Sequence, residues 1–140
     1  MSVDVTPHLN FRGQAREALE FYRSAFGGDL VATTYGDLGS AEDPAEADHL
    51  VWGQVAAPGG FRVMAYDVPG SRPWSPGEAP FFVSVRGDDP EEIAAAWKRL
   101  AEGATVLQPL EPSPWARLYG MLKDRFGVTW VLDVLAEPAA

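Results

Sequence analysis

The sequence has 140 residues, of which 46% are hydrophobic and 22% are charged, and its formal net charge is −9. A chain of this length normally forms one domain with its own core, so we expect a single domain over residues 1–140. The negative charge disfavours nucleic acid and anionic membranes as partners, and the absence of cysteine excludes disulfides and thiolate metal sites.

The N-terminal residues and the hydropathy of the chain give an expectation about its location. The start "MSVDVTPHLN" lacks a basic region followed by an apolar run, so it does not resemble a signal peptide. Apolar stretches all fall short of the roughly 20 residues that span a bilayer. We therefore expect a soluble, cytoplasmic protein.

The first half of the chain is predicted to form a strand, a helix and three further strands. Residues 3–11 alternate between apolar and polar side chains, which indicates a strand with one apolar face. Residues 14–26 place apolar side chains at helical spacing and stop at a pair of glycines. Residues 29–35 follow as a strand, residues 36–48 as a polar loop, and two apolar segments around "PGG" indicate a hairpin that ends near residue 68. The Pro-rich segment over 69–79 is predicted to be a linker.

The second half repeats this order. The segment "FFVSVRG" indicates a strand, and Asp88 or Asp89 followed by Pro90 indicates the start of a helix. After Gly103, the segments "ATVLQPL", "WARLYGMLKD" and "VTWVLDVL" are predicted as strands that are separated by short turns. Trp130 is expected in the core, because it alternates with the residues of the other strand face.

The pairs Arg12–Gly13 and Arg86–Gly87 mark corresponding corners about half a chain length apart. We therefore predict a tandem repeat of two βαβββ modules, over residues 3–68 and 80–135; the alternative is coincidence within an ordinary α+β domain. One helix covers only one face of a four-stranded sheet, so a lone module would leave its other face uncovered. The predicted fold is α+β, in which the two modules pair into a curved mixed sheet around a cavity.

Residues on the strand faces away from the helices are the candidate ligand-binding residues. Trp115, Arg117 and Tyr119 alternate along one predicted strand. If they face inward, they offer a ring for stacking, a guanidinium and a phenol; if they face outward, they pack against a helix or a dimer partner. The full candidate set is His8, Asn10, Tyr66, Trp115, Arg117, Tyr119 and Asp133.

The motifs "LNF-x-G-x-A-x-EALEFY-x-x-AFGG" and "PWARLYGMLKDRFGVTWVL", together with the repeat, resemble the vicinal oxygen chelate superfamily and within it the PhnB-like branch. That superfamily contains glyoxalase I, extradiol dioxygenases and bleomycin- and fosfomycin-resistance proteins. The resemblance implies the paired βαβββ fold, a cavity and a homodimer. His8 departs from the pattern, because a tyrosine is expected there. Members of this branch are often labelled as demethylubiquinone methyltransferases, but the glycine-rich S-adenosylmethionine loop is missing, so we do not infer methyl transfer.

Metal-dependent members of that superfamily hold one divalent ion with His and Glu side chains from the first and last strands of each module. Most of the matching places here are apolar, and a site would need His8, Asp67 and Asp133 to converge. We therefore expect neither a metal nor another cofactor, with a single divalent metal ion as the alternative.

Three functions are consistent with these features. The first is a small-molecule-binding protein of the glyoxalase/bleomycin-resistance type that sequesters or senses an apolar or aromatic compound without a catalytic metal. The second is an enzyme, either a metal-dependent lyase, isomerase or dioxygenase or a metal-free acid–base catalyst. The third is a scaffold protein that acts through its dimer surface. The sequence does not decide whether any reaction is catalysed.

Overall fold

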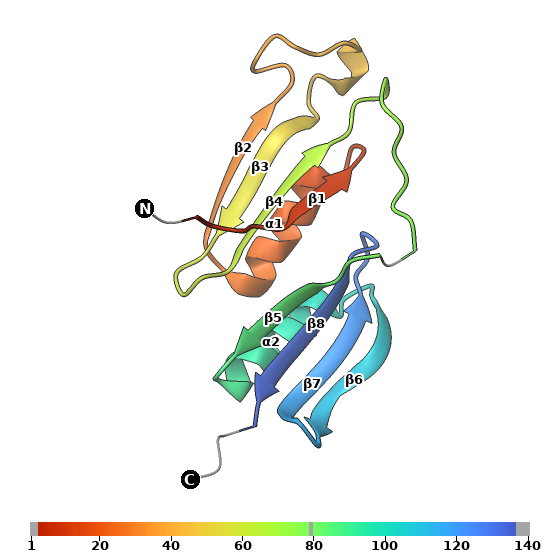
Figure 1. Cartoon of the computed structure of the whole chain (residues 1–140). Coiled ribbons are helices and arrows are strands. Elements are labelled where there is room, and N and C mark those ends of the chain that lie inside the picture. Colours follow the sequence, from red (N-terminus) through yellow and green to blue (C-terminus); the bar gives the residue numbers. More distant parts are fainter. Residues whose placement is uncertain (1–2, 79, 137–140) are drawn as a thin grey trace. The chain divides into compact units, whose positions relative to one another are not determined.

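The computed structural model describes residues 3–78 and 80–136, which belong to two compact units, Met1–Pro76 and Gly77–Ala140 (Figure 1). In the first unit the chain forms β1 (His8–Phe11), α1 (Ala15–Phe26), β2 (Asp29–Thr34), a short 3-10 turn (Pro44–Glu46), β3 (Leu50–Ala56) and β4 (Arg62–Asp67). The sheet order is β1-β4-β3-β2; β1 and β4 are parallel, and the other neighbours are antiparallel.

The second unit repeats this topology. It consists of β5 (Val83–Gly87), α2 (Pro90–Leu100), β6 (Thr105–Ser113), β7 (Ala116–Lys123) and β8 (Thr129–Leu135). Its sheet order is β5-β8-β7-β6, again with a parallel edge pair and antiparallel neighbours. The predicted α+β fold with two βαβββ modules is therefore confirmed. The pairing of the modules around a cavity, their single-domain behaviour and the linker over 69–79 stay predictions.

Each helix packs on one face of its own sheet and forms the core there. In the first unit α1 buries Leu19 and Tyr22 completely, and the sheet contributes Val55, Val63 and Ala65. In the second unit α2 buries Ile93 and Leu100, against the inward residues of β8 Trp130, Leu132 and Val134. Trp130 is 0% exposed, so its predicted place in the core is confirmed. A fully buried side chain of this size contributes about 1.5–3 kcal/mol to stability.

Both sheets carry a glycine where the helix lies closest. A Cβ added at Gly53 on β3 would lie 2.5 Å from Leu19 Cδ1, and one added at Gly120 on β7 would lie 2.8 Å from Trp97 Cζ3. Because the two glycines lack a side chain, the helices can approach the sheets closely. Their positions also show which face of each strand is turned toward the helix.

Several predicted strand boundaries are wrong, and the largest differences lie in β1 and around the β6–β7 turn. The strand predicted over 3–11 begins only at His8, and Val3 and Val5 are 87% and 95% exposed instead of packing under the helix. The reason is the register: β1 pairs with β4, which begins at Arg62 and so leaves the residues before Pro7 without a neighbouring strand. β6 runs on to Ser113 and β7 starts at Ala116, which places Trp115 in the turn between them.

The two helices start in different ways. Asp89 caps α2 as its carboxylate accepts the Glu91 N–H at 3.0 Å, which confirms the predicted cap. The residue before α1, Gln14, makes no such bond. At the start of α1 the capping hydrogen bond is instead made by the carboxylate of Asp67, at the end of β4.

Asp67 is 2% exposed and accepts three backbone N–H groups. They belong to Gly13 at 2.7 Å, Ala15 at 3.0 Å and Leu50 at 2.9 Å. The buried carboxylate thereby ties the start of α1 and the start of β3 to the end of β4.

Neither helix among the described residues has the length and apolar character that crossing a membrane requires.

Candidate functional site

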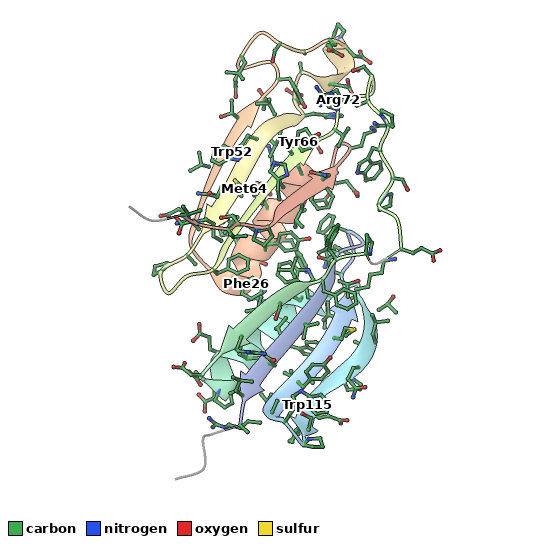
Figure 2. All side chains as sticks on the ribbon, in the orientation of Figure 1. Phe26, Trp52, Met64, Tyr66, Arg72 and Trp115 are labelled. Carbon is green, nitrogen blue, oxygen red and sulfur yellow. The ribbon has the colours of Figure 1, made fainter. Side chains whose placement is uncertain are left out.

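The face of the first sheet that is turned away from α1 carries three of the predicted ligand-binding residues. Strand alternation places the helix-facing residues at Gly53, Ala65 and their neighbours, so the residues between them point to the other side. We call this side the open face of the first sheet. Its central side chains are His8 and Asn10 of β1, Met64 and Tyr66 of β4, and Trp52 and Gln54 of β3. Figure 2 shows Trp52, Met64 and Tyr66 over the strands of this unit.

The side chains of the open face contact one another both between neighbouring strands and within β1. The ring of His8 meets the ring of Tyr66 edge-on, with centroids 5.2 Å apart and planes at 66°. His8 Nδ1 lies 3.0 Å from Asn10 Oδ1. The Trp52 Nε1–H donates to Met64 Sδ at 3.2 Å. Because His8 pairs in register with Met64, the His8–Tyr66 and Trp52–Met64 contacts occupy neighbouring positions on this face.

This surface combines flat rings with a few hydrogen-bonding groups. Tyr66, Trp52 and Met64 are half-buried, whereas His8 and Asn10 are exposed. An imidazole, a phenol and an amide are therefore within reach of a molecule that lies on the rings. Such a mixture of apolar contact area and a few polar groups is typical of small-molecule sites.

Tyr35 lies close to this surface, at the start of the loop after β2. Its hydroxyl donates to the backbone carbonyl of Asp67 at 2.7 Å. Burial raises the pKa of Tyr35, and the nearby Tyr66, Asp67 and Glu46 raise it further. A small cavity of about 40 Å³ lies beside Tyr35 and is also lined by Ser40, Ala41, Glu42, Glu46 and Pro69. This volume suits a few water molecules at most, because ligand pockets usually measure about 300–1,000 Å³.

The segment after β4 is fastened to the end of β1. The guanidinium of Arg12 donates to the backbone carbonyls of Val68 at 3.3 Å and Pro69 at 3.2 Å, and also to that of Arg72. It lies 5.7 Å from the ring centre of Trp74. The Trp74 Nε1–H in turn donates to the backbone carbonyl of Asn10 at 3.1 Å. Trp74 is thus fixed beside the strand that carries His8 and Asn10.

The second sheet has an open face too, and it carries the other predicted residues. Gly120 faces α2, so its neighbour Tyr119 points the opposite way, which argues against helix-side packing of Tyr119; Arg117 lies at the irregularity of the β7–β8 pairing between Ala116 and Leu118. Tyr119 lies opposite Asp133 in register. The exposed ring of Trp115 meets that of Tyr119 edge-on, with centroids 5.3 Å apart. Whether these residues face a cavity stays a prediction.

Asp133 is held by an arginine that our sequence analysis did not include in the site. Arg86 donates to both carboxylate oxygens, from Nε at 3.0 Å and from Nη2 at 3.1 Å. This hydrogen-bonded pairing raises the pKa of Arg86. Arg86 lies two residues after Ser84 on β5, so both side chains point to the same side of the sheet. The side on which Arg86 lies could therefore be predicted. That Asp133 lies opposite depends on the parallel register of β5 and β8, which the sequence does not give.

The residues of the alternative metal site do not fit a metal centre well. Asp67 belongs to the helix-facing side of β4, and its oxygens accept the three backbone N–H groups described above. Both oxygens of Asp133 accept bonds from Arg86. Within residues 3–78 and 80–136, no group of three or more His, Asp or Glu residues could hold a metal ion. The expectation of no metal stays a prediction.

The comparisons with known proteins identify the class. The family model described as Glyoxalase/Bleomycin resistance protein/Dioxygenase superfamily matches residues 7–132. The chain belongs to this superfamily, as the resemblance implied.

Individual relatives agree with this assignment. Protein PA1353 from Pseudomonas aeruginosa is 33% identical, with a TM-score of 0.83, over 97% of this chain and 100% of that one. A Bacillus cereus structure described as "Putative 3-demethylubiquinone-9 3-methyltransferase, PhnB protein" is 26% identical, with a TM-score of 0.73, over 94% and 99%. Protein YjdN of Escherichia coli is 26% identical over 95% of this chain and 96% of its own length. The PhnB-like resemblance is therefore confirmed.

Proposed function

We propose that this protein binds a small planar aromatic molecule on the open face of the first sheet, without a catalytic metal. The observation that carries the proposal is the presence of the His8–Tyr66 and Trp52–Met64 contacts at neighbouring positions of one sheet face. Flat rings and a thioether give contact area for an aromatic compound, and the imidazole and amide beside them give it an orientation.

The superfamily supports binding but does not choose a ligand. Its family model names glyoxalases, bleomycin-resistance proteins and dioxygenases together, so membership fits both binders and enzymes. The metal-dependent enzyme is less well supported, because the bonds of Asp67 and Asp133 leave His8 without partners for a metal site. The homodimer and the cytoplasmic location stay predictions.

Thermal-shift screening tests the proposal, because a ligand that binds only the native state raises the Tm. The screen should use planar compounds such as phenols, indoles and quinones. We expect at least one of them to raise the Tm, and Tyr66→Ala to remove that rise. Leu38→Ala is the matched control, since Leu38 is an exposed apolar side chain of a loop.

Three results would contradict the proposal. A Tm rise that survives Tyr66→Ala and Trp52→Ala would place the ligand elsewhere. Stoichiometric metal in the purified protein, lost in His8→Ala, would favour the enzyme instead. A screen in which no compound raises the Tm would favour the scaffold protein.

A further inference from the structure

We infer that His8 presents an unprotonated Nε2 to the ligand, and that the ligand is therefore a neutral aromatic compound with a hydroxyl donor, such as a phenol or an enol. This inference rests on the proposed function, because it names the ligand class for the same surface. It starts from one contact, between His8 Nδ1 and Asn10 Oδ1, which are 3.0 Å apart.

When the imidazole of His8 is neutral, this contact fits only one of its two tautomers. An amide oxygen can only accept, so Nδ1 of His8 donates to Asn10 Oδ1. A neutral imidazole has a single N–H group, and the other nitrogen then has a free lone pair. Asn10 consequently sets His8 to the tautomer in which Nε2 is a hydrogen-bond acceptor.

Asn10 is itself held in place from two sides. It pairs in register with Tyr66 of the neighbouring strand β4. Its backbone carbonyl, on the outer edge of β1, accepts the Nε1–H of Trp74 at 3.1 Å. The amide that orients the imidazole therefore projects from a strand whose backbone is held on both sides, and its side-chain bond is the one to His8.

The surroundings of His8 select the shape and charge of the ligand. The ring of Tyr66 meets His8 edge-on at 5.2 Å, so a compound stacked on one ring has its substituents near the other. A lone pair at Nε2 attracts a hydroxyl hydrogen and repels an anion. The net charge of −9 also disfavours anions. These features together favour a neutral hydroxyl on a flat ring over a carboxylate or a phosphate.

The tautomer can be measured without any ligand. Long-range 15N–1H correlation spectra distinguish the two neutral forms of histidine, and this chain has only two histidines. At pH 8 we expect the His8 signals, assigned from their loss in His8→Gln, to show the Nδ1–H form. Asn10→Leu should shift His8 toward the Nε2–H form, while His49, as the internal control, stays unchanged. An Nε2–H form in the wild-type protein would overturn the inference even if ligands bind.

The ligand class can be tested with three matched probes, p-cresol, 4-methylanisole and p-toluate, which share a ring and differ in one group. We expect p-cresol to bind about tenfold more tightly than 4-methylanisole, since about 1.4 kcal/mol for one hydrogen bond corresponds to that factor. His8→Phe keeps a flat ring but lacks the acceptor, so this difference should vanish in that variant.

Several outcomes would overturn the ligand class. Equal binding of p-cresol and 4-methylanisole to the wild-type protein would show that Nε2 makes no bond. Preferred binding of p-toluate would indicate an anion site. If no probe binds, the phenol class is wrong, whereas a Tm rise with another compound, sensitive to Tyr66→Ala, would still support the proposed function.

Discussion

The two units fix the start of their helices with carboxylates of different origin. In the second unit the carboxylate is local, because Asp89 directly precedes α2 and bonds to Glu91. In the first unit it comes from Asp67, on a strand far along the chain from α1. The local cap stabilises one helix end, whereas the distant one joins a helix and two strands. The helix of the first unit is therefore held by a carboxylate from a distant strand, whereas the helix of the second unit is capped by the residue directly before it.

The open faces differ in a related way. In the first unit the pair formed by the parallel edge strand and the last strand is Asn10 and Tyr66, which are neutral. In the second unit the corresponding pair, counted from the two Arg–Gly corners, is Ser84 and Val131, and the ion pair of Arg86 with Asp133 lies two residues farther along. A neutral aromatic surface suits ligand binding, while the charged pair satisfies its own members. The repeat thus conserves the backbone arrangement but not the chemistry of the face.

The largest effect is expected for Asp67→Ala. It would leave three backbone N–H groups without their acceptor, and we expect a loss of about 3–5 kcal/mol in the free energy of unfolding. Urea denaturation followed by circular dichroism measures it. Asp67→Asn, which keeps one acceptor oxygen, should lose less. A cost for Asp67→Ala no larger than that for Asp89→Ala would contradict the anchoring role.

The glycines under the helices should differ from each other. In Gly120→Ala the new methyl would meet the ring of Trp97 and the backbone of Leu110, both of which are rigid. In Gly53→Ala it would mainly meet the end of the Leu19 side chain, which can rotate. We expect losses of about 2–3 and about 1 kcal/mol, respectively, in urea denaturation. Exposed Gly70→Ala is the control and should have almost no effect; equal losses at Gly53 and Gly120 would be inconsistent with this packing.

Removing the local cap should cost less than removing Asp67. Asp89→Ala takes away one hydrogen bond at an exposed helix end, and we expect a loss of about 1 kcal/mol. Asp89→Ser keeps a capping oxygen and should recover most of it. The same denaturation experiment measures both variants. If Asp89→Ser were as unstable as Asp89→Ala, the capping bond would not be the cause.

The smallest effect concerns alkaline pH. Burial raises the pKa of Tyr35 above its ordinary value of 10.0, so the folded state favours the neutral phenol that donates to Asp67. This contribution to stability is complete below the ordinary value and is lost as the pH rises through the raised pKa. The difference in free energy of unfolding between the wild-type protein and Tyr35→Phe should therefore shrink when the pH rises above the raised pKa of Tyr35. If this difference stayed constant up to the highest pH at which the protein is folded, the hydrogen bond from the Tyr35 hydroxyl to Asp67 would contribute nothing to stability.

The sequence predicted the parts of the fold that depend on local periodicity. Both helices, the β3–β4 hairpin and the Asp89 cap follow from residue spacing within short segments. The start of β1 could not be predicted, because it depends on where the neighbouring strand β4 begins. Alternation in residues 3–6 resembles a strand even though no strand pairs with them in the described residues.

The candidate site was predictable only in part, for the same reason. His8 and Asn10 share one side of β1 by alternation, so the sequence could place them together. That Trp52 contacts Met64, and that His8 contacts Tyr66, depends on strand register. The role of Asp67 was out of reach, because its partners lie on segments that only the folded sheet brings together.

The bond between Trp74 and the Asn10 carbonyl has a consequence for self-association. β1 is an edge strand, and such strands offer unpaired backbone groups to which strands of other molecules can add. The indole covers one of these groups on β1. We therefore expect a variant that lacks this ring to offer a template for intermolecular strand addition and to aggregate more readily than the wild-type protein.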